Sequence, residues 1–234
     1  IGGYASTGGA AARGAGAPLP FVDSLVNLGV VRDVGCESQD DEIARVLAPK
    51  GVKVKLAPET RNQTPDALFR KPWPAEIDGW SHFLHDASNN AVSSDTVVEP
   101  PKGLRWTCGP AYARSHEHFS SMSAMVTAGG RIFYIIDEGP ISSVYLPPQW
   151  KLVARDAFSG VRLWKRPLPK WGYREWNTRG MWSAPLTLNR RVVTDGSRVF
   201  VTFGYQAPVT EVDPATGEDI RTLGGTDGTD EMIL

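Results

Sequence analysis

The feature that most constrains this chain is a short motif that occurs twice. The stretch 154–164 (ARDAFSGVRLW) recurs as 211–221 (EVDPATGEDIR), an offset of 57 residues (211 − 154 = 57). The copies share an acidic residue and a glycine: Asp156 and Gly160 in the first, Asp213 and Gly217 in the second. A short Asp side chain accepts the N–H groups of a turn, and Gly adopts the positive φ that such turns need. Each copy therefore predicts two strands joined by a D-x-x-[ST]-G turn.

The distance between the copies indicates repeated β-sheet units. Four-stranded units that recur about every 40 to 50 residues are typical of β-propeller blades. The longer period here has a local cause, because Phe133 precedes Asp156 by 23 residues (156 − 133 = 23) whereas Phe200 precedes Asp213 by 13 (213 − 200 = 13). The surplus contains three prolines within 140–148 and predicts a loop insertion between strands.

The first copy resembles the tryptophan-docking motif of pyrroloquinoline-quinone (PQQ) repeat propellers, A-x-D-x-x-[ST]-G-x-x-x-W. In that family the indole wedges between neighbouring blades. The second copy has Glu211 and Arg221 in place of the leading Ala and the closing Trp. The segment 104–106 (LRW) has the sequence of the last strand of a preceding blade. The residues to which the resemblance gives a structural role are Trp106, Asp156, Gly160, Trp164, Asp213 and Gly217.

The resemblance covers about residues 104 to 234 and implies a mainly β fold. We expect a partial PQQ-like β-propeller of about two blades with flanking strands, preceded by a small α/β segment. We divide the chain into a flexible Gly/Ala-rich segment (1–20), a strand–helix–strand segment (21–56), a Pro-rich linker (57–79) and incomplete propeller blades (80–234). Because a propeller needs typically four to eight blades to close, we expect the sequence to be a piece of a longer polypeptide.

The strand–helix–strand segment carries a second resemblance. Residues 42–51 (EIARVLAPKG) are similar to the E-x-x-R-V-L-x-P-G-G passage of class I S-adenosylmethionine-dependent methyltransferases, with Lys50 in place of the first glycine. That family binds its cofactor through a glycine-rich loop much earlier in the domain, and residues 1–20 do not match it. The resemblance implies a methyltransferase-like remnant or a cut fragment, which we expect not to transfer methyl groups by itself.

Composition excludes several classes of protein. With 25 Lys and Arg against 26 Asp and Glu, the net charge of −1 lacks the positive field typical of nucleic-acid binders. The longest apolar run, 132–136, is too short to span a membrane. Cys36 and Cys108 lie far apart and form no C-x-x-C pair, which argues against a disulfide framework or a thiolate zinc site. The propeller resemblance implies an exported or periplasmic protein, but no signal peptide is visible, so the compartment stays open.

Two histidine pairs are the candidate metal ligands. His116 and His118 form an H-x-H, which on a strand places both rings on one face, and His82 and His85 form a second pair. The alternative is that these rings tie loops to backbone carbonyls. An aromatic and basic segment, 171–182, could bind a carbohydrate or an anion by stacking, or could pack between blades.

We expect a non-catalytic binding or scaffold module that holds a protein or small-molecule ligand on a propeller face. We assign it no catalytic residue and no cofactor of its own. One alternative is part of a PQQ-dependent quinoprotein oxidoreductase, similar to alcohol or sugar dehydrogenases, with PQQ and calcium bound in the full-length protein. The adjacent cysteines of that family are absent from this chain. A second alternative is a methyltransferase–propeller fusion.

Overall fold

The computed structural model describes residues 18–31, 37–55, 67–101, 103–114, 120–176 and 184–234. The chain divides into two compact units, Ile1–Ala75 and Glu76–Leu234, and each is described by itself. The division falls inside the segment predicted as a linker. The Gly/Ala-rich residues 1–17 lie outside the described residues.

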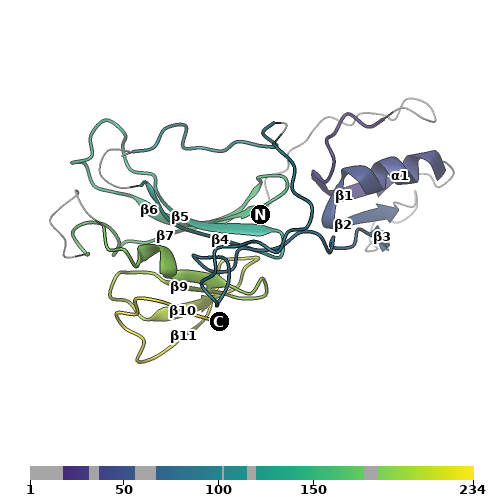
Figure 1. The fold of residues 1–234 in the computed structure, drawn as a ribbon. Coiled ribbons are helices and arrows are strands. Elements are labelled where there is room, and N and C mark those ends of the chain that lie inside the picture. The colour runs from purple at the N-terminus through teal and green to yellow at the C-terminus, as the bar shows by residue number, and fades with distance from the viewer. Residues whose placement is uncertain (1–17, 32–36, 56–66, 102, 115–119, 177–183) are drawn as a thin grey trace, which may run out of the picture. The chain divides into compact units, whose positions relative to one another are not determined.

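The first unit is a three-stranded sheet with one helix (Figure 1). Its elements are β1 (Val26–Val31), α1 (Glu37–Val46), β2 (Leu47–Lys55) and β3 (Ala67–Arg70). β1 and β2 are parallel and are joined through α1, which gives the strand–helix–strand order predicted for 21–56. β3 pairs antiparallel with β2 inside the predicted linker, so the prediction of a linker over 57–79 missed this strand. A four-residue strand has no sequence signal strong enough to be recognised without its partner.

The first strand of the predicted strand–helix–strand segment is covered on one face only. β1 begins at Val26, and its Leu28 and Val30 side chains are exposed. The other face of β1 packs under α1, where a Cβ added to Gly29 would lie 3.4 Å from Ile43 Cγ2. Apolar composition alone therefore did not show that only one face of this strand is covered.

The residues of the methyltransferase-like pattern hold the chain that precedes β1. Arg45 donates to Asp23 Oδ1 at 2.5 Å and to the Phe21 carbonyl at 3.0 Å. Glu42 Oε2 accepts a hydrogen bond from Arg45 Nη2 at 2.8 Å and another from the backbone N–H of Leu19 at 2.9 Å. These hydrogen bonds to its charged form, first that of Arg45, lower the pKa of Glu42 to about 2. In this structure the E-x-x-R residues therefore make contacts within the unit itself.

The second unit contains two four-stranded antiparallel sheets, so the described part of the chain is mainly β. The first sheet has the order β4 (Met122–Ala128), β5 (Arg131–Asp137), β6 (Trp150–Asp156) and β7 (Arg162–Pro167). The second sheet has the order β8 (Val192–Thr194), β9 (Val199–Thr202), β10 (Val209–Val212) and β11 (Asp219–Thr222). In both sheets each strand pairs with its neighbour in sequence.

The two sheets share one hydrophobic core, and Figure 1 shows them layered one on the other. The core contains side chains from one face of each sheet: Val126, Phe133, Ile135, Leu152 and Ala154 from the first, and Val192, Val199, Val201 and Val212 from the second. Trp164 and the connection between the sheets complete it, with Leu168, Trp171, Trp176 and Leu188. Removal of these apolar surfaces from water is what holds the sheets together.

Equivalent side chains of the two sheets point in the same direction along the stack of sheets. Phe133 pairs with Val126 and Ala154, and Phe200 holds the same place in the second sheet, paired with Val193 and Glu211. Phe133 lies in the shared core, whereas Phe200 packs on the opposite side of the second sheet, in a small cluster that Leu223 and Met232 partly cover. The second sheet therefore follows the first as the next member of a stack, and is not its face-to-face mirror partner.

The predicted insertion is the loop between β5 and β6, residues 138–149, and a buried ion pair organises it. Arg114 Nη1 donates to Asp137 Oδ2 at 2.7 Å, and both side chains are about 95% buried. Arg114 also donates to backbone carbonyls of the loop, among them that of Val144 at 3.2 Å. Asp137 Oδ1 accepts the N–H of Gln149 at 2.7 Å. The loop is thus held at both ends and along its length.

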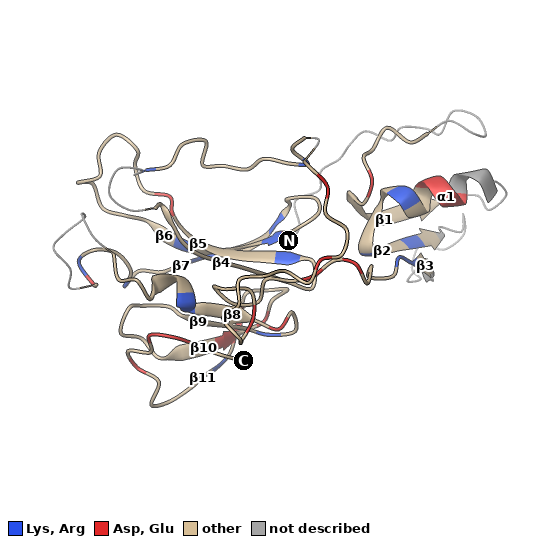
Figure 2. Ribbon diagram, viewed as in Figure 1, with Lys and Arg blue, Asp and Glu red and all other residues tan. Residues whose placement is uncertain are grey.

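The strands of the first sheet of the second unit carry more Lys and Arg than Asp and Glu, and Figure 2 shows blue segments on them. The strands of the second sheet carry Glu211, Asp219 and Arg221. In the part of the chain that the structure describes, there is no helix long and apolar enough to cross a membrane.

Candidate functional site

The best-defined contact between the two sheets is the docking of Trp164 onto a turn of the second sheet. Trp164 projects from β7, is 8% exposed, and donates from Nε1 to the Pro214 carbonyl at 3.0 Å. The indole lies directly on Gly217, where an added Cβ would be 2.6 Å from Trp164 Cδ2. Glycine at position 217 is therefore required for the indole to dock.

The turn that receives the indole is built by Asp213. Its Oδ1 accepts the N–H groups of Ala215 at 2.7 Å and Thr216 at 3.0 Å, and these bonds, that of Thr216 first, lower the pKa of Asp213. Gly217 closes the turn at φ +77° and donates its N–H to the Asp213 carbonyl at 2.8 Å. Thus the D-x-x-[ST]-G residues form the turn and leave a flat backbone surface for the ring.

The same arrangement occurs at the equivalent turn of the first sheet. Trp106 Nε1 donates to the Ala157 carbonyl at 3.0 Å, and a Cβ added to Gly160 would lie 2.5 Å from Trp106 Cδ2. Asp156 Oδ1 accepts the N–H groups of Phe158 and Ser159. In both cases an indole from the preceding part of the chain covers the turn between the third and fourth strands of the next sheet.

Arg166 adds a second contact between the sheets that was not predicted from the sequence. Its Nη1 donates to the Gly217 carbonyl at 2.8 Å and to Asp219 Oδ1 at 2.5 Å, and its guanidinium lies 4.0 Å from the ring centre of Phe203. Arg166 follows Trp164 by two positions, but Cys108 stands at the same distance after Trp106. A comparison of the repeats therefore carried no signal for this arginine.

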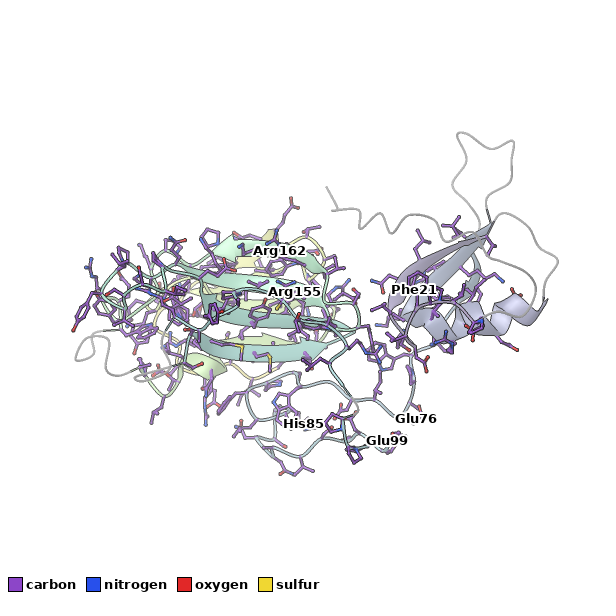
Figure 3. The ribbon with its side chains drawn as sticks, turned by 90° about the horizontal axis from the view of Figure 1, so that it is seen from above. Phe21, Glu76, His85, Glu99, Arg155 and Arg162 are labelled. Carbon is purple, nitrogen blue, oxygen red and sulfur yellow. The ribbon has the colours of Figure 1, made fainter. Side chains whose placement is uncertain are left out.

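His82 and His85 lie in a tight loop of the irregular segment that contains Glu76 and Glu99 (Figure 3). His85 Nε2 lies 2.5 Å from Asp78 Oδ2, and the pKa of Asp78 is lowered by the N–H of Ser94 and then by His85. His82 Nδ1 lies 2.7 Å from Ser81 Oγ, and burial lowers the pKa of His82. Both rings are engaged in hydrogen bonds within the protein.

Only one of the two histidine pairs predicted as metal ligands, His82 and His85, lies among the described residues. Among the described residues, no group of three or more His, Cys, Asp or Glu side chains is placed to hold a metal ion. The ring of His82 pairs with the Ser81 hydroxyl and that of His85 with the Asp78 carboxylate, and not with the backbone carbonyls that the alternative prediction named. His116 and His118 lie outside the described residues.

In the aromatic segment the two described tryptophans pack inside the protein, whereas Tyr173 is partly exposed and Arg174 is exposed. Trp171 and Trp176 are 3% and 2% exposed, and Trp176 contacts the rings of Trp150 and Trp171 at centroid distances of 5.7 and 6.4 Å. Buried rings do not offer a face to a ligand in solution. Residues 177–183 of this segment lie outside the described residues.

Comparison with known proteins adds no assignment: no family model matches the chain, and no curated protein matches it.

Proposed function

We propose that the chain is part of a PQQ-like β-propeller that serves as a non-catalytic binding or scaffold module. Each four-stranded sheet is one blade, and the chain passes from the last strand of one blade to the first strand of the next. The observation that carries the proposal is the repeated docking of an indole: Trp106 onto the turn at Gly160, and Trp164 onto the turn at Gly217.

Three further observations support this architecture. Phe133 and Phe200 face in the same rotational sense, which is what a stack of blades around an axis requires. The first strands of the sheets, β4 and β8, contact each other, as the inner strands of neighbouring blades do. Both sheets are four-stranded meanders with the same order.

A module of this kind binds through loops that rigid sheets hold in place. The loop 138–149 fits this role because the buried pair of Arg114 and Asp137 fixes it while its Ile141 and Tyr145 side chains are exposed. We propose this loop as a surface for a protein or small-molecule ligand.

The architecture is tested by Trp164→Ala and Trp164→Phe. The Ala variant should lower the free energy of unfolding by about 3–5 kcal/mol, as for other large buried rings. It should also speed amide exchange in the turn 213–217, because the indole covers that turn. Trp164→Phe keeps an aromatic ring and should therefore lose less unfolding free energy than Trp164→Ala. Unchanged protection of the turn in Trp164→Ala would contradict the blade assignment.

The non-catalytic role is tested by adding PQQ with Ca²⁺ to the purified protein and recording its absorption spectrum and calcium content. We expect no stoichiometric quinone band. A calcium-dependent quinone band together with oxidation of an alcohol or a sugar would overturn the proposal in favour of a quinoprotein oxidoreductase.

We propose that the first unit is a methyltransferase-like remnant without methyl-transfer activity. Glu42 and Arg45, which carry the resemblance, bind each other and the chain near residues 19–23. Calorimetric titration with S-adenosylmethionine should show no binding, and saturable binding would contradict this assignment.

A further inference from the structure

Three consecutive residues, Trp80, Ser81 and His82, each contact a different part of the second unit. The Trp80 carbonyl accepts the N–H of Thr127 on β4 at 2.7 Å, and the Ser81 carbonyl accepts the N–H of Thr194 on β8 at 3.1 Å. The third residue, His82, accepts the N–H of Leu234 at Nε2, at 3.2 Å. Successive residues of this segment thus contact three different parts of the unit: β4, β8 and the segment that contains Leu234.

The first two contacts, to Thr127 and to Thr194, are made at equivalent positions of the two sheets. Thr127 is the β4 partner of Ile132, and Thr194 is the β8 partner of Val199. Each of those partners directly precedes one of the equivalent phenylalanines, 133 or 200. The segment therefore binds the same backbone N–H group of the first strand in two successive sheets.

The segment is held in a fixed shape. Trp80 donates from its backbone N–H to Thr127 Oγ1 at 2.9 Å and from Nε1 to the Phe83 carbonyl at 3.0 Å. The His82 N–H donates to the His85 carbonyl at 3.1 Å, and the ring of His85 meets that of Trp80 edge to face at 5.3 Å. These contacts close the loop on itself.

The proton arrangement of His82 follows from its partners. Ser81 Oγ donates to the His85 carbonyl at 3.3 Å, so its oxygen is free to accept the Nδ1–H of His82 at 2.7 Å. The Nε2 lone pair then accepts the N–H of Leu234. His82 is therefore the neutral tautomer protonated at Nδ1.

The segment that His82 binds, residues 230–234, lies beside the start of β8. The Met232 N–H donates to the Arg190 carbonyl at 3.3 Å. The fully buried Arg191 donates to Asp230 at 2.7 Å, and Arg190 donates to Glu231 at 2.6 Å. Met232 also contacts the cluster on the far side of the second sheet, where a following sheet would pack.

We propose that residues 80–82 form a clasp that joins the first strands of three successive repeats, with 230–234 as the beginning of the third. This inference rests on the repeat architecture proposed above. The clasp acts on the first strands, whereas the docked indoles act on the turns between third and fourth strands. It thereby fixes the spacing of the repeats where their first strands meet.

The test compares amide exchange at Thr194 and Leu234 by NMR in clasp variants of the full chain. His82→Ala removes the acceptor and should speed exchange at Leu234 by about 2- to 10-fold, the worth of one hydrogen bond. His82→Gln offers an amide oxygen near the position of Nε2 and should restore most of the protection. In the parent chain, the ¹⁵N shift of His82 Nε2 should be that of an unprotonated nitrogen.

Thr127→Val removes the acceptor of the Trp80 N–H and should speed exchange at Thr194 and Leu234 as well, because all three contacts share one segment. The matched control is Thr210→Val, since that hydroxyl is on a largely buried threonine of the second sheet and pairs with Thr222 Oγ1 at 3.5 Å between β10 and β11. The control should leave Leu234 unchanged.

Unchanged exchange at Leu234 in His82→Ala, or equal effects of the two Thr→Val variants there, would overturn the clasp. Should His82→Ala fail to fold, the comparison of Thr127→Val with Thr210→Val gives the result. Failure of the blade assignment is seen separately, at the turn 213–217 in Trp164→Ala. The clasp can thus fail while the blade assignment stands.

Discussion

Glu211 and Arg221 face each other across β10 and β11 at the positions that Ala154 and Trp164 hold across β6 and β7. Arg221 Nε donates to Glu211 Oε2 at 2.6 Å. The two departures of the second copy from the docking motif are therefore one structural change, because the residues are cross-strand partners. In the first sheet, Trp164 contacts the turn of the next sheet. At the equivalent position of the second sheet, Arg221 forms an ion pair with Glu211 on the neighbouring strand.

This pair predicts a measurable coupling. Arg221→Ala leaves the Glu211 side chain, which is 7% exposed, without its charged partner and should cost about 1–3 kcal/mol of unfolding free energy. The double variant Glu211→Ala with Arg221→Ala should cost less than the sum of the single variants, since no buried carboxylate remains. Urea unfolding of the four proteins measures the cycle, and strict additivity would contradict the pairing.

The insertion loop should depend on Arg114. Arg114→Leu leaves the carboxylate of Asp137 buried and unpaired, which should cost about 3–5 kcal/mol. The loop 138–149 should then be cut faster by a protease, because several of its carbonyls lose their donor. The control is Lys165→Ala, which removes a partly exposed partner of Glu138 in the same loop and should cost about 0–1 kcal/mol. Equal effects of the two variants would show that Arg114 does not organise the loop.

The turns could be predicted because their chemistry is local. Asp156 and Asp213 each bind N–H groups two and three residues ahead, and the glycines take the positive φ that the pattern requires. The position of the insertion followed from a difference in length between two copies of one pattern. Such features need no knowledge of the rest of the fold.

Features that depend on distant partners could not be predicted. β3 exists because β2 is beside it, and Arg166 finds its acceptor on another sheet, 51 residues away in sequence. The residue type of His82 predicts a metal ligand, yet its Nε2 accepts the N–H of Leu234, a backbone group that no side-chain pattern records. Sequence spacing shows which groups are near each other along the chain, and these contacts join groups that are far apart.

The first unit should lose stability in acid through Glu42. Its folded-state pKa of about 2 lies below the ordinary value of 4.5, so its contribution is complete above pH 4.5 and is lost as the pH falls towards 2. Glu42→Gln should remove this part of the pH dependence in amide exchange of residues 40–54. The control is Asp41→Asn, which changes an exposed neighbouring carboxylate and should leave the pH dependence of amide exchange as it is in the parent chain. An unchanged acid profile in Glu42→Gln would contradict the role given to this residue.

The central claim, that Trp164 docks the two sheets as successive repeats, is tested most directly by comparing Gly217→Ala with Gly225→Ala. Both glycines have φ +77°, so both variants should lose about 1–2 kcal/mol from backbone strain. A Cβ at 225 meets no atom within 4 Å, whereas a Cβ at 217 meets the indole of Trp164 at 2.6 Å. We predict a larger loss of unfolding free energy for Gly217→Ala and the disappearance of that excess when Trp164 is replaced by Ala. Equal losses at the two glycines, or an excess that persists without Trp164, would contradict the docking of the sheets by this indole.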